Sequence, residues 1–417
     1  MKTKFYIAFT IAHITTYSAL HSAVFPPVWG FFAHKLINRL AVFTLPPEMA
    51  GFYKKNIAYI SEHAVDPDKR RYSSKHEAPR HYIDLDVYGK PPFHALPRKW
   101  LDALICFTDI YAVDRSGDTC LLIDRRGIAL EEKEIAFRLH DRLLSSKDTV
   151  RVSRKLYTDF YFRNILPKQY EDEHELPIDS FKLVFPGLAE YEHLISVEHL
   201  SEHGILPFHL QLMEKRLSAA FRSGDNGKIL QLSAEIGHYL GDAHVPLHTS
   251  RNYNGQLSGQ VGIHAFWESR LPELFSSEYD FWVGAAVYLP ESENTYWQIV
   301  SDSHALVDSL LVMERHLSLN FPSDRIKCPE QRMGATVITQ CEEYARAYHE
   351  ALKGQVESRL RKAIITTGSV WMTAWVNAGQ PDLSKLGIDK ESINEQSVEA
   401  IESGSAIPNF MLGRPEN

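Results

Sequence analysis

The stretch IGHYLGDAHVPLHTSRNYNGQLSGQVGIHAFWESRLPE, residues 236–273, contains five side chains of the kinds that bind metal ions. They are His238, Asp242, His248, His264 and Glu268. His238 and Asp242 are four residues apart, as are His264 and Glu268, so each pair lies on one face of a helix, one turn apart. Zinc binds histidine nitrogen and carboxylate oxygen. Two such pairs with His248 between them favour a site for two metal ions over two helical salt bridges.

Helical patterns on both sides of this stretch predict a mainly α fold. We expect helices over residues 30–42, 46–61, 130–144, 207–221, 228–243, 297–317 and 341–378, the last broken near Gly368. Two short apolar runs around a glycine in residues 105–128 predict a small hairpin. The aromatic stretch 156–177 is expected to be irregular, and it either packs in the interior, which is favoured, or forms a loop over the site. The expected architecture is a single multi-helix domain with irregular inserts and one small β-hairpin.

The composition is that of an ordinary globular protein, with 417 residues, 44% hydrophobic and 24% charged. The net charge of −8 means that no global basic field favours nucleic acid, which weakens a nuclease hypothesis without excluding it. The cysteines form two local pairs, Cys106 with Cys120 and Cys328 with Cys341. Neither pair has the spacing of a zinc site, and each is either a disulfide or two free thiols.

The N-terminus has the pattern of an export signal. Lys2 and Lys4 precede a mostly apolar run over residues 5–20, which is too short and too polar for a good membrane span. No later run is long and apolar enough to be transmembrane, and no protein partner is evident. We therefore expect an exported protein, periplasmic or extracellular, although the residues alone show no clear cleavage site.

The motifs HYLGDAHVPLH and GIHAFWE resemble the superfamily of zinc-dependent phospholipases C and S1/P1-type nucleases. Members of this superfamily are α-helical and use three clustered zinc ions to cleave phosphate esters. Their mature chains begin with a tryptophan that is soon followed by a histidine, a pattern that Trp29 and His34 match. The segments HAVDPDKRR and RHYID match the Asp and His that follow in the family. The resemblance covers about half of the chain, and residues 88–201 have no counterpart in it.

The resemblance implies residues 1–28 as the signal peptide, 29–385 as the catalytic domain with the insert 88–201, and 386–417 as a polar tail. It implies a first zinc on Asp68, His81, His238 and Asp242, and a second on His248, His264 and Glu268. A third would take the amino and carbonyl groups of Trp29, His34 and the second oxygen of Asp242, leaving two ions if Trp29 is not the mature N-terminus. Asp66 is the alternative to Asp68.

The resemblance also implies the chemistry. Clustered zinc ions screen the charge of a phosphodiester and lower the pKa of a bound water toward ~7. Asp68 is the candidate to orient or deprotonate that water. Arg71 either binds a phosphate oxygen or forms a surface salt bridge.

The residues indicate the substrate class less specifically than they indicate the metal ligands. Glu268 and the short loop between His248 and His264 favour a phospholipase C-like enzyme with a phospholipid substrate. The spacings from Trp29 to His34 and from Asp68 to Arg71 are closer to the single-strand nucleases, which act on nucleic acid. A non-catalytic exported zinc-binding protein is the third hypothesis.

Overall fold

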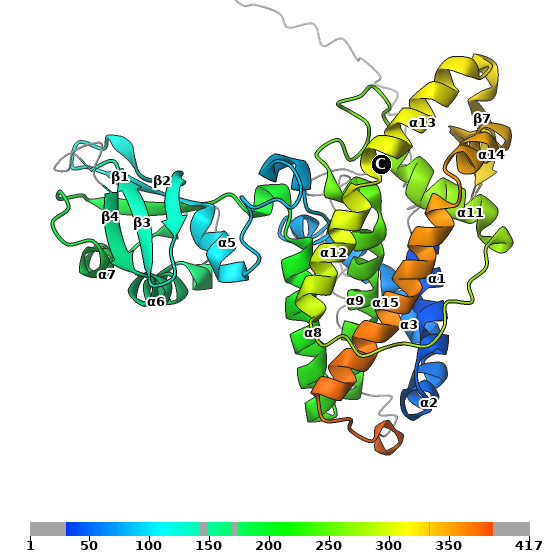
Figure 1. Ribbon diagram of the computed structural model, residues 1–417, viewed down its shortest axis with the longest axis horizontal. Coiled ribbons are helices and arrows are strands. Elements are labelled where there is room, and N and C mark those ends of the chain that lie inside the picture. Colours follow the sequence, from blue (N-terminus) through cyan, green and yellow to red (C-terminus); the bar gives the residue numbers. More distant parts are fainter. Residues whose placement is uncertain (1–30, 142–148, 169–173, 333, 387–417) are drawn as a thin grey trace, which may run out of the picture.

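Helix α9 (Asn226–His244) lies at the centre of a helical bundle in the computed structural model, which describes residues 31–141, 149–168, 174–332 and 334–386. Around α9 pack α1 (Phe31–Ala41), α8 (Leu206–Ser223), α12 (Ser292–His304) and α15 (Gln355–Asn377) (Figure 1). The Asp225 side chain caps α9 by accepting from the Lys228 amide, and the helix ends before Pro246, which cannot continue it. Ile229, Ile236 and Leu240 are all buried along its length.

Two glycines allow α1 to approach α9 closely. A Cβ on Gly237 would lie 1.9 Å from Asn38 Oδ1, and one on Gly241 would lie 2.7 Å from His34 Nδ1. Asn38 uses this proximity to donate hydrogen bonds to the carbonyl oxygens of Ala234 (2.9 Å) and Ile60 (3.2 Å). The absence of a side chain at Gly237 and Gly241 therefore allows His34 to lie close to α9.

A six-stranded antiparallel sheet lies to one side of the bundle, with α6 (Arg154–Asn164) and α7 (Ile178–Val184) against it (Figure 1). The strand order is β4-β3-β2-β1-β6-β5. The strands are β1 (Thr108–Val113), β2 (Thr119–Leu130), β3 (Glu134–Leu139), β4 (Thr149–Ser153), β5 (His174–Glu175) and β6 (His193–Glu198). Helix α5 (Trp100–Cys106) leads into the sheet from the bundle.

The remaining elements complete the bundle and a smaller second core. They are α2 (Pro47–Lys55), α3 (Ile57–Glu62), α4 (Asp66–Arg70), α11 (Leu271–Phe275), α13 (Val307–Asn320), α14 (Glu342–Ala351) and the hairpin of β7 (Lys327–Arg332) with β8 (Ala335–Gln340). In the second core, Phe266 packs against Tyr344 and Tyr348. A disulfide joins Cys328 to Cys341, whereas Cys106 and Cys120 are free thiols.

The expectation of a mainly α, single multi-helix domain is wrong, because the fold is mixed α/β. The hairpin expected in residues 105–128 exists as β1 and β2, but it belongs to the larger sheet. Within the helix expected over 130–144, residues 134–139 form strand β3 instead, in which Ile135, Phe137 and Leu139 are buried; residues 142–144 lie outside the described residues. The charged residues that precede and follow this strand resemble the exposed face of a helix. Pairing with β2 and β4, which the pattern of one segment does not show, makes it a strand.

Helix boundaries also differ from the expectation. Residues 46–61 divide into α2 and α3 at Asn56, and 297–317 divides into the ends of α12 and α13. The break expected near Gly368 falls instead at Gly354, where φ is +78°. Residues 156–177 are not wholly irregular, since α6 buries Tyr157 and Phe160.

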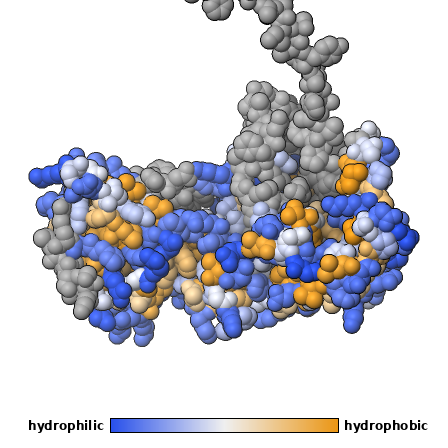
Figure 2. Space-filling view, turned by 90° about the horizontal axis from the view of Figure 1, so that it is seen from above, coloured by the Kyte–Doolittle hydropathy of each residue, from blue (hydrophilic) through white to orange (hydrophobic). Residues whose placement is uncertain are grey.

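Some expectations lie outside the described residues, among them the signal peptide and almost all of the tail. None of the described helices is both long enough and apolar enough to cross a lipid bilayer. Figure 2 shows apolar patches on the upper face that are divided by hydrophilic residues, over the part of the surface not drawn in grey.

The close contact of α1 with α9 predicts a large effect of a single methyl group. Gly237→Ala should lower the free energy of unfolding by about 1–3 kcal/mol or more, because the new Cβ displaces Asn38. Gly51→Ala in α2 is the matched control, since no neighbouring atom lies within 4 Å of its Cβ position; it should raise stability by roughly 0.5–1 kcal/mol. Urea unfolding of both variants measures the difference, and equal effects would contradict the packing described.

Candidate metal centre

Eight of the nine residues expected to bind metal converge at the C-terminal end of α9. They are His34 on α1, Asp68 on α4, His81 directly after the 3₁₀ turn η3 (Ala78–Arg80), His238 and Asp242 on α9, His248 on the 3₁₀ turn η7 (Pro246–Thr249), His264 on α10 (Ile263–Ala265) and Glu268 on the π-helical turn η8 (Phe266–Arg270). All eight are buried. The ninth, Trp29, lies outside the described residues.

Local structure explains why distant segments meet here. Pro246 starts η7 (Pro246–Thr249) directly after α9, which turns His248 back toward the helix end. His264 in α10 (Ile263–Ala265) and Glu268 in η8 (Phe266–Arg270) keep their side chains together, with His264 Nε2 2.7 Å from Glu268 Oε2. Single π-helical turns are rare and are often found at functional sites.

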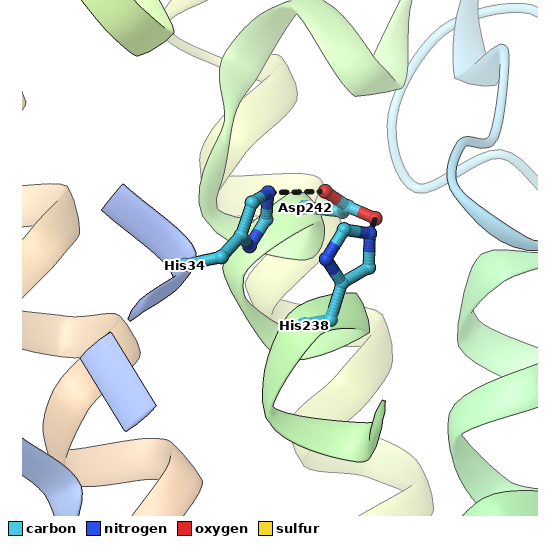
Figure 3. Close-up of side chains that lie close together, drawn as sticks. All are labelled: His34, His238 and Asp242. Atoms are coloured by element: carbon cyan, nitrogen blue, oxygen red, sulfur yellow. Dashed lines mark ion pairs between the residues drawn. The ribbon is translucent and has the colours of Figure 1, made fainter. Parts of the chain in front are cut away.

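Three sets of ligand atoms lie close enough to hold ions. They are His34 with His238 and Asp242, Asp68 with His81 and His238, and His248 with His264 and Glu268; within each set the atoms lie within 4.8 Å of one another. Figure 3 shows the first set, in which His34 and His238 approach Asp242 from two sides.

Some ligand pairs lie at hydrogen-bond distance, such as His264 with Glu268 at 2.7 Å, whereas others have the wider spacing of atoms that share one ion. Two ligand atoms that are each about 2.0–2.1 Å from a tetrahedral zinc are roughly 3.4 Å apart. His34 Nε2 lies 3.4 Å from Asp242 Oδ1, His238 Nε2 lies 3.3 Å from Asp242 Oδ2, and His248 Nε2 lies 3.5 Å from Glu268 Oε2. The donor set and its spacing therefore suit zinc.

Three of the five histidines in the cluster are held by hydrogen bonds on the side away from it. Nδ1 of His238 donates to the Ala64 carbonyl (2.8 Å), and Nδ1 of His248 donates to the His81 carbonyl (2.6 Å). His264 Nδ1 donates to the Tyr253 carbonyl at 3.1 Å. A proton on Nδ1 leaves the lone pair of Nε2 free in each ring, and such outward hydrogen bonds are typical of metal-binding histidines.

Two carboxylates connect the three sets. Asp242 presents Oδ1 to His34 and Oδ2 to His238, so it is placed to bridge two ions. Glu268 faces His248 and His264 with Oε2, and its Oε1 lies 3.4 Å from His34 Nε2. The contact of Glu268 with His34 was not predicted from the sequence, and spacing along the chain carries no signal for it.

Charge pairing dominates the electrostatics of the cluster. Burial alone would raise the pKa of Asp242, but the neighbouring His238 and His248 rings hold it well below its usual range, although burial lowers the pKa of His238 itself. Glu268 behaves in the same way, through hydrogen bonds from His248 and His264. Burial alone would lower the pKa of His34, yet its hydrogen bond to Glu268 and the charge of Asp242 raise it to about 9. The pocket therefore requires positive charge among its carboxylates.

Asp68, rather than Asp66, faces the cluster. Its Oδ1 lies 3.6 Å from His238 Nε2 and 3.8 Å from His81 Nδ1. Asp66 instead pairs with His63 (2.6 Å) and with Lys69 (2.9 Å).

Arg71 is only 1% exposed, and its Nη1 lies 3.9 Å from Asp68 Oδ1. It is therefore buried beside the cluster and is not the exposed salt bridge that the sequence left open.

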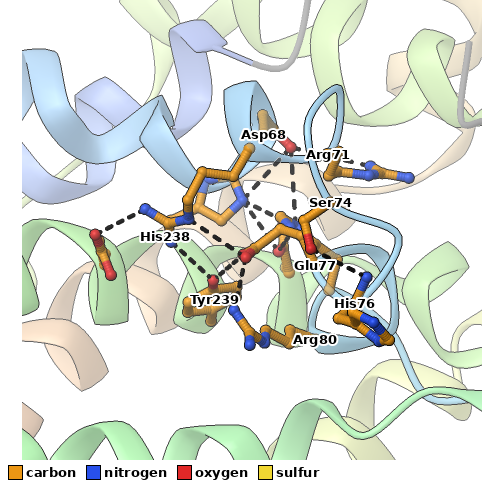
Figure 4. A network of polar contacts seen from close by, with 12 residues as sticks. Asp68, Arg71, Ser74, His76, Glu77, Arg80, His238 and Tyr239 are labelled. Atoms are coloured by element: carbon orange, nitrogen blue, oxygen red, sulfur yellow. Dashed lines mark hydrogen bonds and ion pairs between the residues drawn. The ribbon is translucent and has the colours of Figure 1, made fainter. Parts of the chain in front are cut away.

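One charged residue beside the cluster was missed. Glu77, labelled in Figure 4, is 2% exposed. Its Oε1 lies 3.6 Å from His81 Nε2. Glu77 and His81 are four residues apart, the same spacing that singles out the two helical pairs, but in the opposite order.

Comparisons of the chain with known protein families, with curated proteins and with solved structures found no match. The metal groups are thus supported by geometry alone.

The raised pKa of His34 predicts how the metal-free protein responds to pH. Its ordinary value is about 6.5, so the stabilisation from the charged ring is complete below pH 6.5 and is lost as pH rises through about 9. Chelator-treated protein should lose on the order of 3 kcal/mol of unfolding free energy over this window. His34→Gln should show a much smaller loss. Urea unfolding at pH 6 and pH 9 measures the change for each protein. An equal loss of unfolding free energy in the wild type and in His34→Gln would show that His34 is not the group responsible.

Proposed function

We propose that this protein is a zinc-dependent hydrolase of phosphate esters, similar to phospholipases C. The observation that carries the proposal is the single buried cluster in which Asp242 and Glu268 connect three sets of histidine and carboxylate ligands. Three ions are proposed, with Trp29 completing the third set as the mature N-terminus. The expected ligands are Trp29, His34, Asp68, His81, His238, Asp242, His248, His264 and Glu268.

Clustered zinc supplies Lewis-acid stabilisation of a phosphoryl group and a water that is acidic enough to attack it near neutral pH. Asp68 is the most exposed of the eight described ligands, at 9%, and Glu268 follows at 7%. A substrate therefore approaches from the side of these carboxylates. Asp68 orients the attacking water and accepts its proton, and Arg71 donates to a phosphate oxygen from beside it.

A phospholipid is the favoured substrate. The net charge of −8 gives a polyanionic nucleic acid no global attraction, and Glu268 is the acidic ligand typical of the phospholipases. A single-strand nuclease is the first alternative, and a non-catalytic zinc-binding protein is the second alternative. Export after removal of residues 1–28 is part of the proposal, and the Cys328–Cys341 disulfide is consistent with an oxidising compartment.

The domain assignment is likewise proposed, with residues 29–385 as the catalytic unit, 88–201 as its insert and 386–417 as a tail. All six strands of the sheet fall within this insert. The bundle and the metal ligands fall outside it.

Paired assays test the reaction. Purified protein should hydrolyse a choline phospholipid faster than single-stranded DNA, a chelator should abolish both activities, and added zinc should restore them. Faster cleavage of DNA would favour the nuclease alternative. A zinc-loaded protein with no chelator-sensitive turnover of either substrate would contradict the enzyme proposal.

His238→Ala tests the ligand set, because His238 belongs to two of the three groups. The variant should lose at least one zinc ion per chain and its hydrolytic activity should fall by at least about 100-fold. His63→Ala is the matched control, since His63 stacks on Tyr59 and pairs with Asp66 away from the cluster. Metal analysis should give the control the wild-type zinc content, and full zinc content in His238→Ala would show the ligand set to be wrong.

A further inference from the structure

The ring of His81 is turned the opposite way from those of His238, His248 and His264. Its Nδ1 faces the cluster, 2.9 Å from Asp242 Oδ2 and 3.1 Å from His238 Nε2. Its Nε2 points away, toward Glu77 Oε1 at 3.6 Å. A ring that binds metal through Nδ1 must carry its proton on Nε2, so the outward partner must be an acceptor.

Glu77 is an acceptor that its surroundings keep charged. Its Oε2 lies 2.7 Å from Arg80 Nη1 and 3.3 Å from Arg70 Nε, and its Oε1 accepts from the Tyr239 hydroxyl. Figure 4 shows Glu77 close to Arg80 and Tyr239, with Asp68 farther from them. Two guanidinium groups compensate the buried carboxylate, and the hydroxyl of Tyr239 limits its movement.

The same network ties Glu77 to α9. Arg70 Nη2 donates to the Tyr239 hydroxyl at 3.2 Å, and Arg70 Nη1 donates to Glu235 Oε1 at 2.8 Å. Tyr239 and Glu235 lie on the helix that also provides His238 and Asp242. Arg70 and Tyr239 thus fix the position of Glu77 relative to α9, the helix that carries His238 and Asp242.

We propose that Glu77 is a positioning residue, which holds His81 in the tautomer that binds metal through Nδ1 and makes the ring a stronger ligand. The proposal rests on the metal cluster of the proposed function and adds a residue that the family resemblance does not supply. Carboxylates that accept from the outer nitrogen of a ligand histidine fix its orientation and raise its basicity. Glu77 is too far behind the ring to be a ligand itself, because the ring lies between Glu77 and the other ligand atoms.

Zinc affinity tests this role directly. Glu77→Gln keeps the size of the side chain and removes its charge, and it should weaken binding of one zinc ion about 10–100-fold while the other ions remain near wild-type affinity. The matched control is Glu235→Gln, which also loses a carboxylate paired with Arg70 but does not contact His81. Competition with a chelator of known affinity measures each dissociation constant, and circular dichroism verifies that each variant is folded.

A second readout reports the tautomer. Nitrogen NMR of the zinc-loaded protein with ¹⁵N-labelled histidine, assigned with a His81→Gln variant, should show His81 bound through Nδ1 and protonated on Nε2. In Glu77→Gln the Nε2 proton should exchange faster with water. Binding of His81 through Nε2 would overturn the proposal, as would unchanged affinity in Glu77→Gln or equal losses in Glu77→Gln and Glu235→Gln.

These outcomes separate the role of Glu77 from the reaction. A protein that loses one tightly bound zinc in Glu77→Gln, but hydrolyses no phosphate ester, would keep the positioning role and lose the proposed hydrolase. If the protein hydrolyses phosphate esters but Glu77→Gln binds zinc with wild-type affinity, the hydrolase proposal would stand and the positioning role of Glu77 would be lost.

Discussion

Burying Asp242 among histidines at the end of α9 requires compensating positive charge, and much of the surrounding structure follows from that requirement. Asp242 is 1% exposed and faces His34 with one oxygen and His238 with the other. An isolated carboxylate in such a place would cost several kcal/mol and would become protonated instead. In the metal-free chain the charged ring of His34 offsets part of this cost, and a metal ion would offset more of it.

Close packing makes this arrangement possible. Gly237 and Gly241 bring α1 against α9, and without them His34 could not reach Asp242. The segments just before and just after the sheet insert are hydrogen-bonded close to the cluster. The Ile83 amide donates to the His248 carbonyl, and the Leu206 amide donates to the Tyr82 carbonyl. The segments that enter and leave the insert thus meet beside His81, and the insertion leaves the cluster intact.

Short-range spacing was enough to find the centre of the site. The pairs His238/Asp242 and His264/Glu268 could be recognised because a helix brings residues four apart to one face. The contact between Glu268 and His34 could not, because it joins segments more than two hundred residues apart that meet only through helix packing. Glu77 was within reach of the same four-residue rule but lies in a loop region, where the rule is not normally applied. The sheet was missed for a similar reason, since β3 is decided by its pairing with β2 and β4 rather than by its own charged pattern.

Anomalous diffraction at the zinc edge from crystals of the purified protein tests the central claim most directly. We expect one peak enclosed by Asp68, His81, His238 and Asp242, and a second enclosed by His248, His264 and Glu268. A third peak is expected beside His34 if the mature chain begins at Trp29. Zinc-soaked crystals with no anomalous peak among these side chains would show that the cluster is not a zinc site.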